Sequence, residues 1–221
     1  MGHRAEKQRR QRQEIIANTI ALTQEGGLAG CRVQAIAAKS GISTATFFNY
    51  FPSKESVLHE WLDDQLWFLF EGARDQHAQG AALRRALRRV AQRLAEWAVA
   101  KPEACRAAAQ CYRSSEAVAG LPARGRAMDG APGLQLIEQA RDRDEIRGDI
   151  EPKLAAMVLR LALIGGLAEG LAGDRLEASG SLQTSLRSLV DLWVDGLRKR
   201  NERVQSAAGR RGRLVTGRAD S

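Results

Sequence analysis

The chain has 221 residues, of which 44% are hydrophobic and 27% charged, and its formal net charge at pH 7 is +8. This composition excludes a disordered or collagen-like chain and provides enough apolar residues for one or two folded domains. The N-terminus lacks an apolar run, and the most apolar region, 154–172, contains Arg160 and Glu169, so we expect neither a signal peptide nor a membrane span. The three cysteines lack metal-ligand spacing, so we expect a cytoplasmic protein without a metal or cofactor.

Residues 1–13 are strongly basic, and two interpretations of them remain open. They form either a solvated arm or an arm that reaches DNA phosphates or the minor groove. We predict a flexible basic arm over 1–8, followed by a first long helix over 9–25 that ends at Gly26 and Gly27.

Residues 33–50 contain the most informative pattern in the chain. Val33, Ile36 and Ala37 recur at helical spacing, which predicts one buried helical face. Gly41 follows that face, and a glycine there can take a positive φ and end the helix sharply. Ser43 then precedes a second short helix over 44–50, whose first free amides it can cap.

Pro52 ends this second helix, and Ser53 is placed to cap a third that begins at Lys54. A helix, a glycine turn and another helix make the helix-turn-helix pattern, which places its second helix in the DNA major groove. The side chains predicted to hold the two helices at a fixed angle are Val33, Ile36, Ala37, Ile42, Phe47 and Phe51.

These residues also resemble a known family. The matching runs are Ile36-Ala37, Ser40-Gly41-Ile42-Ser43, Thr46-Phe47-Phe48-Asn49-Tyr50-Phe51 and Ser53-Lys54-Glu55. They are similar to the N-terminal domain of the TetR/AcrR family of bacterial transcriptional regulators, over roughly residues 9–60. The resemblance implies a homodimeric repressor whose C-terminal domain binds a small molecule and so releases DNA.

The resemblance also implies which residues contact the DNA. The positions that map onto DNA-contacting positions of the family, with the capping serine included, are Gln34, Ser43, Thr44, Ala45, Thr46, Phe48, Asn49 and Tyr50, and Lys54 maps onto its phosphate-contacting lysine. The family usually has tyrosine where this chain has Phe48, so we expect a van der Waals contact there without a phenolic hydrogen bond. Arg32 stands where the family often has threonine, and it is either a charge-assisted phosphate contact or solvated.

The helix that begins at residue 54 continues towards Gln76 and should connect the DNA-binding module to the rest of the chain. Residues 80–100 form an amphipathic helix with a stripe of arginines. This stripe is either a second nucleic-acid patch or a solvated face that pairs with acidic neighbours. Pro102 opens a helix with Cys105 and Cys111, which are either thiol sensors or buried small apolar residues.

Residues 113–133 are predicted to form a loop or a broken helix, and a helix from residue 134 is predicted to end at Gly148. The last two helices, from Pro152 and over 181–200, have broad apolar faces that suit a four-helix dimer interface. The predicted interface residues are Leu161, Ile164, Leu186, Val190, Trp193 and Leu197, with an intrachain core as the alternative. Gly165, Gly166 and Gly170 should allow a close helix approach.

The predicted fold is all-α, with a three-helix DNA-binding domain over 1–60, a helical ligand-binding and dimerisation domain over 61–200, and a disordered basic tail over 201–221. We expect a regulator that binds a palindromic DNA operator as a homodimer, with an unidentified small-molecule effector and no membrane partner. A DNA-coating or protein-interaction module with the same fold is the alternative. An enzyme built on His59, Asp63, Asp64 and His77 is disfavoured because these residues lack a recognised metal or catalytic spacing.

Overall fold

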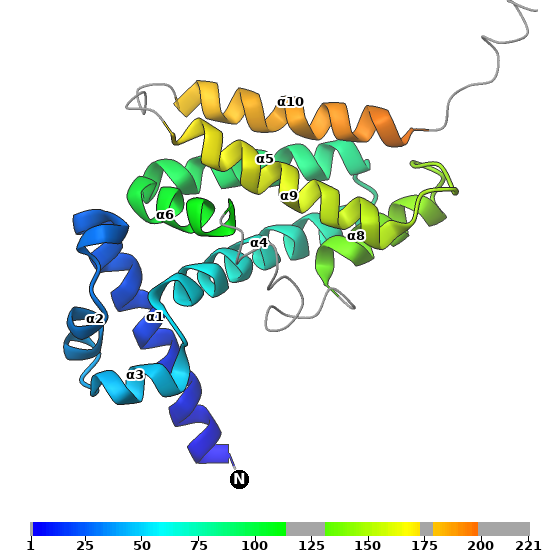
Figure 1. Cartoon of the computed structure of the whole chain (residues 1–221). Helices are drawn as coiled ribbons and strands as arrows, with labels where there is room; N and C mark the ends of the chain where they lie inside the picture. Colours follow the sequence, from blue (N-terminus) through cyan, green and yellow to red (C-terminus); the bar gives the residue numbers. More distant parts are fainter. Residues whose placement is uncertain (1, 114–130, 173–178, 199–221) are drawn as a thin grey trace, which may run out of the picture.

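The computed structural model describes residues 2–113, 131–172 and 179–198, and every regular element in these ranges is a helix (Figure 1). The predicted all-α fold is confirmed. The helices are α1 (Gly2–Gly30), α2 (Val33–Lys39), α3 (Thr44–Tyr50), α4 (Lys54–Ala78), α5 (Leu83–Ala100), α6 (Pro102–Arg113), α8 (Pro132–Asp142), α9 (Pro152–Gly170) and α10 (Ser179–Leu197). The predicted tail over 201–221 and most of the predicted loop over 113–133 lie outside the described residues.

Two hydrophobic clusters correspond to two parts of the molecule. Helices α1 to α3 form a small unit at one end, and α4 runs from that unit into the stack of α5, α6, α8, α9 and α10 (Figure 1). The smaller cluster lies among α1 to α4 and contains Ile15, Ile36 and Phe47. The larger cluster fills the rest of the body, and Ile16 of α1 packs against both. The predicted domain boundary at residue 60 therefore falls within a continuous helix that both clusters share.

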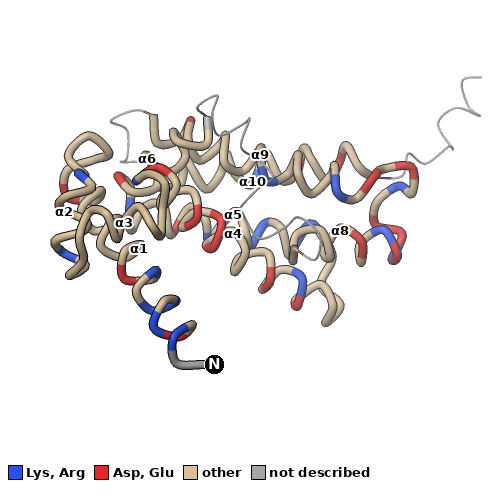
Figure 2. The backbone as a smooth tube through the Cα atoms, turned by 60° about the horizontal axis from the view of Figure 1, so that its bottom comes forward, with Lys and Arg blue, Asp and Glu red and all other residues tan. Residues whose placement is uncertain are grey.

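Helix α1 is longer than the sequence pattern predicts. It begins at Gly2 instead of residue 9, so the residues predicted to form a flexible arm are helical. Their Arg, Lys, Gln and Glu side chains favour helix intrinsically, which explains the extension. Figure 2 shows Lys and Arg along these first turns. Gly27 breaks the helix with φ 64°, as predicted, and a short helical turn follows it.

Arginines of α5 pair with carboxylates of α10. Arg84 donates to Asp191 at 3.0 Å and also pairs with Asp195, while Arg88 donates two hydrogen bonds of 2.8 Å to Asp191. These contacts join two helices that are about a hundred residues apart in sequence. Part of the arginine stripe is therefore engaged by acidic neighbours, as one of the two sequence interpretations proposed.

The predicted end of the helix at Gly148 is wrong. Helix α8 ends at Asp142, and the left-handed residue that reverses the chain is Asp144, with φ 59°. Aspartate tolerates this conformation better than most non-glycine residues. The Glu145 amide bonds back to the Ala140 carbonyl at 2.9 Å, which satisfies an end of the helix. The next helix starts as predicted, because the Glu151 side chain caps the amides of Lys153 and Leu154 ahead of α9.

Helices α9 and α10 pack closely against each other because glycines face the contact. A Cβ added at Gly166 would lie 2.5 Å from the Leu189 Cδ1, and one at Gly170 would clash with Leu182. This agrees with the predicted close approach. Three of the residues predicted for the dimer interface, Ile164, Leu186 and Val190, are buried in the larger hydrophobic cluster of the chain itself.

The described cysteines behave as buried apolar residues. Cys31, Cys105 and Cys111 are all buried and unbridged. Burial raises the pKa of the Cys105 thiol to about 12 and that of Cys111 to about 11. A reactive thiol sensor needs a populated thiolate, so this environment favours the apolar interpretation. Among the described helices, none has the length and hydrophobicity needed to cross a membrane.

Candidate nucleic-acid interface and ligand pocket

The turn between α2 and α3 has the geometry that its sequence predicts. Gly41 takes φ 65°, and the Ile42 amide donates to the Ala37 carbonyl at 3.0 Å, which closes the end of α2. The neighbouring Ser40 is buried, its hydroxyl accepts from Asn18, and its carbonyl accepts from Gln11. Helix α1 thus holds the end of α2 in place by side-chain hydrogen bonds.

Helices α3 and α4 both begin at serine caps. The Ser43 hydroxyl accepts from the Thr46 amide at 3.0 Å, and Ser53 and Ser56 form a reciprocal capping box at the start of α4. Both caps were predicted from the sequence. The second serine of the capping box was not, because Glu or Gln is the usual residue at that position.

The module core agrees with the sequence prediction. Ile36, Ala37, Phe47 and Phe51 are buried, and the half-buried Val33 and Ile42 pack against the same cluster. Burial of Phe47 and Phe51 fixes the rotation of α3 about its axis. Ala45, Phe48 and Asn49 of α3 consequently point outward, and Phe48 is 51% exposed, whereas Tyr50 packs partly against the module core.

The predicted DNA-contacting residues differ in exposure, and five of them share one groove. Six of them are exposed, namely Arg32, Gln34, Ser43, Ala45, Phe48 and Asn49, and four are half-buried, namely Thr44, Thr46, Tyr50 and Lys54. A shallow groove of about 370 Å³ joins the starts of α2, α3 and α4, and Arg32, Gln34, Thr44, Phe48 and Lys54 line it. Predicted residues from the starts of three separate helices therefore share one surface.

Lys54 also makes structural hydrogen bonds that the sequence did not predict. Its ammonium donates to the carbonyls of Leu28 at 2.6 Å and Cys31 at 3.0 Å. These carbonyls follow the break in α1, so Lys54 ties that segment to the start of α4. An ammonium has three donors, and the two carbonyls use two of them. One donor is therefore left for a phosphate.

Arg12 is a positioning residue that the sequence analysis missed. Its guanidinium donates to both carboxylate oxygens of Glu60 on α4, to the Tyr50 carbonyl at the end of α3, and lies 4.0 Å from the Phe51 ring centroid. One side chain thus links α1, α3 and α4. The sequence does not indicate this role, because Arg12 lies in a run of basic residues and its partner Glu60 is 48 positions away.

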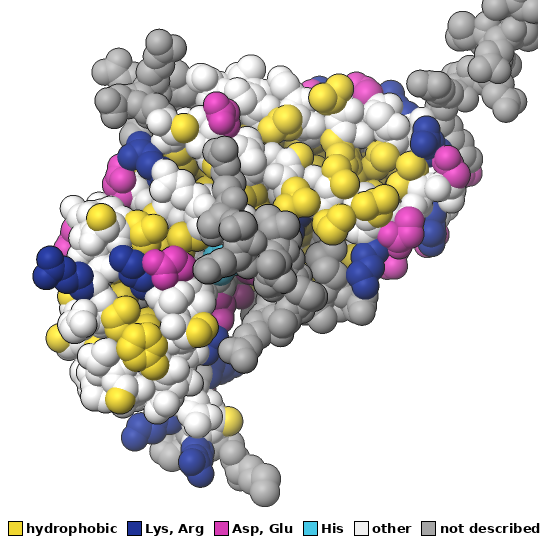
Figure 3. Space-filling view, viewed as in Figure 1, with side chains coloured by type: hydrophobic (Ala, Val, Ile, Leu, Met, Phe, Trp, Pro, Cys, Tyr) yellow, Lys and Arg dark blue, Asp and Glu magenta, His cyan; other side chains and the backbone are white. Residues whose placement is uncertain are grey.

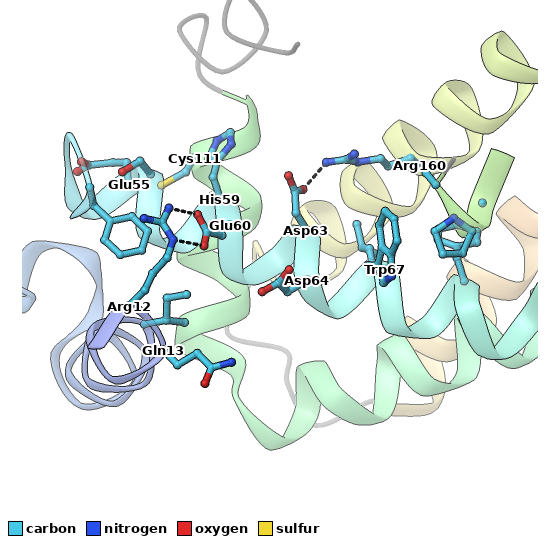
Figure 4. A pocket seen from close by; sticks show the side chains of 18 of the residues that line it. Arg12, Gln13, Glu55, His59, Glu60, Asp63, Asp64, Trp67, Cys111 and Arg160 are labelled. Atoms are coloured by element: carbon cyan, nitrogen blue, oxygen red, sulfur yellow. Dashed lines mark hydrogen bonds and ion pairs between the residues drawn. The ribbon is translucent and has the colours of Figure 1, made fainter. Parts of the chain in front are cut away.

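A cavity lies where the module meets the body (Figure 4). It has a volume of about 920 Å³, and α1, the α3–α4 turn, α4, α6, α8 and α9 all contribute to its lining. This volume is typical of small-molecule sites. The sequence analysis named no pocket residues, because the lining combines single positions from many segments.

A charged cluster forms part of this lining. Arg160 of α9 pairs with Asp63 of α4, and both contact the hydroxyl of Tyr112 on α6. His59 stacks on the Tyr112 ring with centroids 4.0 Å apart. Burial raises the pKa of the Asp63 carboxyl, and the Arg160 charge opposes that rise. The cluster therefore joins α4, α6 and α9 at the cavity.

Of the residues of the disfavoured enzyme hypothesis, His59, Asp63 and Asp64 line the same cavity, whereas His77 lies apart from them. His77 is fully buried and contacts Glu145 at 2.7 Å and Gln139 at 3.3 Å, near the far end of α4. His59 and Asp63 lie in the cluster around Tyr112, at the other end of the same helix. In the described part of the chain, no three His, Cys, Asp or Glu side chains form a group that could hold a metal ion.

A capped helix-turn-helix unit on an all-α body defines this chain as a helix-turn-helix DNA-binding protein. Residues 15–61 match the family described as bacterial regulatory proteins, tetR family. The N-terminal domain of this chain thus belongs to the TetR family of transcriptional regulators. The family suggested by the motif is therefore confirmed.

Solved structures show the same fold over most of the chain. FadR of Thermus thermophilus, a TetR family transcriptional repressor in complex with lauroyl-CoA, has 22% identity and a TM-score of 0.67, covering 86% of this chain and 96% of that one. A TetR transcriptional regulator from Rhodococcus sp. RHA1 has 21% identity and a TM-score of 0.63, covering 87% and 99%. FadR of Bacillus subtilis in complex with stearoyl-CoA has 16% identity and a TM-score of 0.58, covering 84% and 99%. No curated protein matches the sequence.

Proposed function

We propose that this protein is a cytoplasmic, homodimeric transcriptional repressor that binds a palindromic operator and is released from it by a small molecule. The observation that carries the proposal is the position of α3. Its apolar side chains Phe47 and Tyr50 pack into the module, while Ala45, Phe48 and Asn49 stand exposed on its outer face. A short capped helix presented in this way suits insertion into a major groove.

The exposed face of α3 offers chemistry that can distinguish bases. The Asn49 amide can bond an adenine edge in two places, and Ala45 and Phe48 can contact thymine methyl groups. Gln34 on α2 and Arg32 before it lie beside this face and suit contacts with the flanking backbone. The exposed basic turns of α1 carry Arg9 and Arg10 and can add sequence-independent affinity.

The proposed dimer interface is the outer face of α9 and α10. Leu154, Met157, Val158 and Leu161 repeat along α9 at helical spacing and are each more than 40% exposed, and Leu192 of α10 is 73% exposed. Figure 3 shows hydrophobic side chains gathered over this part of the body. A contiguous apolar patch of this kind marks an interaction surface. Two-fold pairing of the patch would form a four-helix interface and would set two α3 helices about one DNA turn apart, roughly 34 Å, or a multiple of it.

The proposed route of ligand response runs through α4. This helix lines the 920 Å³ cavity and also carries Glu60, which holds Arg12 of the DNA-binding module. A ligand in the cavity would move the protein between two settings of the paired α3 helices only if it binds the two settings with different affinity. The bound lauroyl-CoA and stearoyl-CoA of the two FadR proteins make acyl-CoA one ligand class to test.

Selection of fragmented genomic DNA on the purified protein near physiological salt, followed by sequencing, tests the proposal. We expect enrichment of a palindrome whose half-sites are about 10 base pairs apart, or a multiple of that spacing. Broad retention without a motif, lost at modestly higher salt, would contradict it and favour the DNA-coating alternative. A parallel selection on protein that has been unfolded, dialysed and refolded removes any co-purified effector that would mask the operator.

A further inference from the structure

The lining of the cavity comes from both parts of the molecule, and this indicates how an effector would act. The DNA-binding module contributes residues 50–53 at the α3–α4 turn and four residues of α1, namely Arg9, Arg12, Gln13 and Ile16. The body contributes residues 131–134 at the start of α8 and Ala156, Leu159 and Arg160 of α9. Figure 4 shows Arg12 and Gln13 on one side of the lining and Arg160 on the other. A molecule that fills this cavity therefore touches the DNA-binding module itself.

Helix α1 meets the body in different ways along its length. Its second half packs on the body directly, since Ile20 is buried in the larger hydrophobic cluster and the Gln24 side chain accepts from the Ala104 amide of α6 at 3.2 Å. Its first half, over residues 9–16, borders the cavity. The second half is thus anchored, whereas the angle of the first half depends on what occupies the cavity.

The pair of Arg12 and Glu60 lies within reach of such an occupant. Both residues belong to the lining, and their side chains keep 38% and 28% of their surface exposed. Arg12 also donates to the Tyr50 carbonyl at the end of α3. An occupant that packs against this pair therefore contacts the side chain that links α1, α3 and α4.

We propose that the effector binds between the DNA-binding module and the body, in contact with α1 and with α8 and α9 at the same time. A ligand stabilises the arrangement that offers it the better site, and the described arrangement has a site of about 920 Å³. Under the proposed function, on which this inference rests, the effector releases the operator. The described angle between α1 and the body is then the operator-released one, and an occupant holds the module at that angle.

A covalently attached occupant tests this proposal without knowledge of the natural ligand. Ala131→Cys places a thiol in the lining at the start of α8, and reaction with N-(1-pyrenyl)maleimide puts a large apolar group there. The native cysteines are buried, and the raised thiol pKa values of Cys105 and Cys111 slow their reaction. The matched control Ala100→Cys carries the same adduct at an exposed site on α5, outside the described lining. The unsubstituted chain, treated in parallel, reports any labelling of native thiols.

Operator affinity is the first measurement. The pyrene adduct at position 131 should weaken binding to the selected operator by at least about ten-fold, and the adduct at position 100 should leave it unchanged. The smaller N-methylmaleimide adduct at position 131 should have a smaller effect. Unchanged or tighter binding with the pyrene adduct at position 131, or an equal loss at both positions, would overturn the proposal. Circular dichroism and sedimentation check fold and assembly, and Ala156→Phe fills the lining from α9 if the adduct at position 131 unfolds the chain.

Hydrogen exchange measured by mass spectrometry tests the contact with α1 directly and needs no DNA. The pyrene adduct at position 131 should slow amide exchange over residues 9–16 several-fold, because it holds this half of α1 against the body. The adduct at position 100 should not change it. Unchanged exchange over residues 9–16 with the adduct at position 131 would refute a site shared by the module and the body, even if operator affinity falls.

Failure of this inference is distinguishable from failure of the proposed function. The genomic DNA selection uses the unmodified chain and depends on neither adduct. If a palindrome is enriched and neither operator affinity nor exchange responds to the adduct at position 131, the regulator stands and the shared site is wrong. If exchange over residues 9–16 slows and DNA is retained without a motif, the shared site stands and the repressor proposal is wrong.

Discussion

Arg12 of α1 and Glu60 of α4 form a two-pronged ion pair, with Nε donating to Oε1 at 2.6 Å and the second prong closing on Oε2. The same guanidinium donates to the Tyr50 carbonyl at 2.7 Å. The hydrogen bond to Glu60 raises the pKa of the Arg12 guanidinium, which therefore stays cationic. Bidentate pairs of this kind fix geometry as well as add energy. The pair thus sets the angle between the DNA-binding module and the helix that lines the cavity.

Glu60→Gln should weaken the contact between α1 and α4, because it removes the negative charge that pairs with Arg12. We expect a loss of unfolding free energy of about 1 kcal/mol, the size typical of half-exposed pairs with good geometry. Urea denaturation followed by circular dichroism measures it. The control is Arg9→Gln, which breaks a fully exposed pair with Glu6 and should change nothing. A similar loss in both variants would mean that the bidentate geometry contributes no stability of its own.

Asn49→Ala should weaken operator binding without weakening the fold. Asn49 is exposed on α3, whereas the Thr46 hydroxyl contacts Ser43 at 2.8 Å, so a Thr46 variant would disturb the helix cap as well. Loss of an amide that contacts a base typically costs about 1–3 kcal/mol of discrimination. Fluorescence anisotropy with the selected operator measures the affinity, and Gln92→Ala on the exposed side of α5 is the control. Unchanged affinity for Asn49→Ala would remove Asn49 from the recognition face.

Lys54→Ala should weaken both the fold and DNA binding. The loss of two hydrogen bonds from a charged donor to the Leu28 and Cys31 carbonyls should cost about 2 kcal/mol of unfolding free energy. Binding should weaken for all DNA sequences, and the slope of log affinity against log salt should flatten by about one unit. Anisotropy titrations at several salt concentrations measure the slope. A change of base preference at unchanged slope would show that Lys54 does not contact phosphate.

Leu192→Glu should dissociate the proposed dimer and leave the monomer folded. Leu192 is 73% exposed, so its replacement costs the monomer little, whereas a buried carboxylate in the interface would weaken dimerisation by at least about ten-fold. Sedimentation velocity measures the assembly, and circular dichroism measures the fold. The matched control Phe68→Glu places the same charge on α4, at another exposed apolar residue, and should remain dimeric. Dissociation by Phe68→Glu alone would move the interface to α4.

Acid should selectively remove the link between α5 and α10. The hydrogen bonds from Arg88, and then those from Arg84, hold the pKa of the Asp191 carboxyl below its ordinary value. A carboxyl whose pKa is lower in the folded chain stabilises the fold above its unfolded pKa, and this stability is lost as the pH falls through the folded value. Asp191→Asn should therefore cost about 1 kcal/mol at neutral pH and progressively less below about pH 4. Urea melts across this range test it. An equal loss of unfolding free energy at all pH values would contradict the ionic origin of the link. The control is Asp149→Asn, which removes the carboxylate of an exposed pair with Arg147.

The sequence by itself determined the DNA-binding module, because the signals there are local. Gly41, Ser43 and Ser53 each act on backbone groups within five residues, so their effects can be inferred from spacing alone. The bounds of α3 were predicted for the same reason. Where local signals compete, as at the end of α8, the prediction chose Gly148 and the chain turns at Asp144.

Only the tertiary structure decided which apolar residues of α9 and α10 face the core and which face outward. Both helices are apolar around most of their circumference, so periodicity alone did not separate Ile164 and Val190, which are buried, from Leu161 and Leu192, which are exposed. The partners of Arg12 and the lining of the cavity were undetermined for a related reason. Both depend on residues that are far apart in the sequence and come together only when the helices pack.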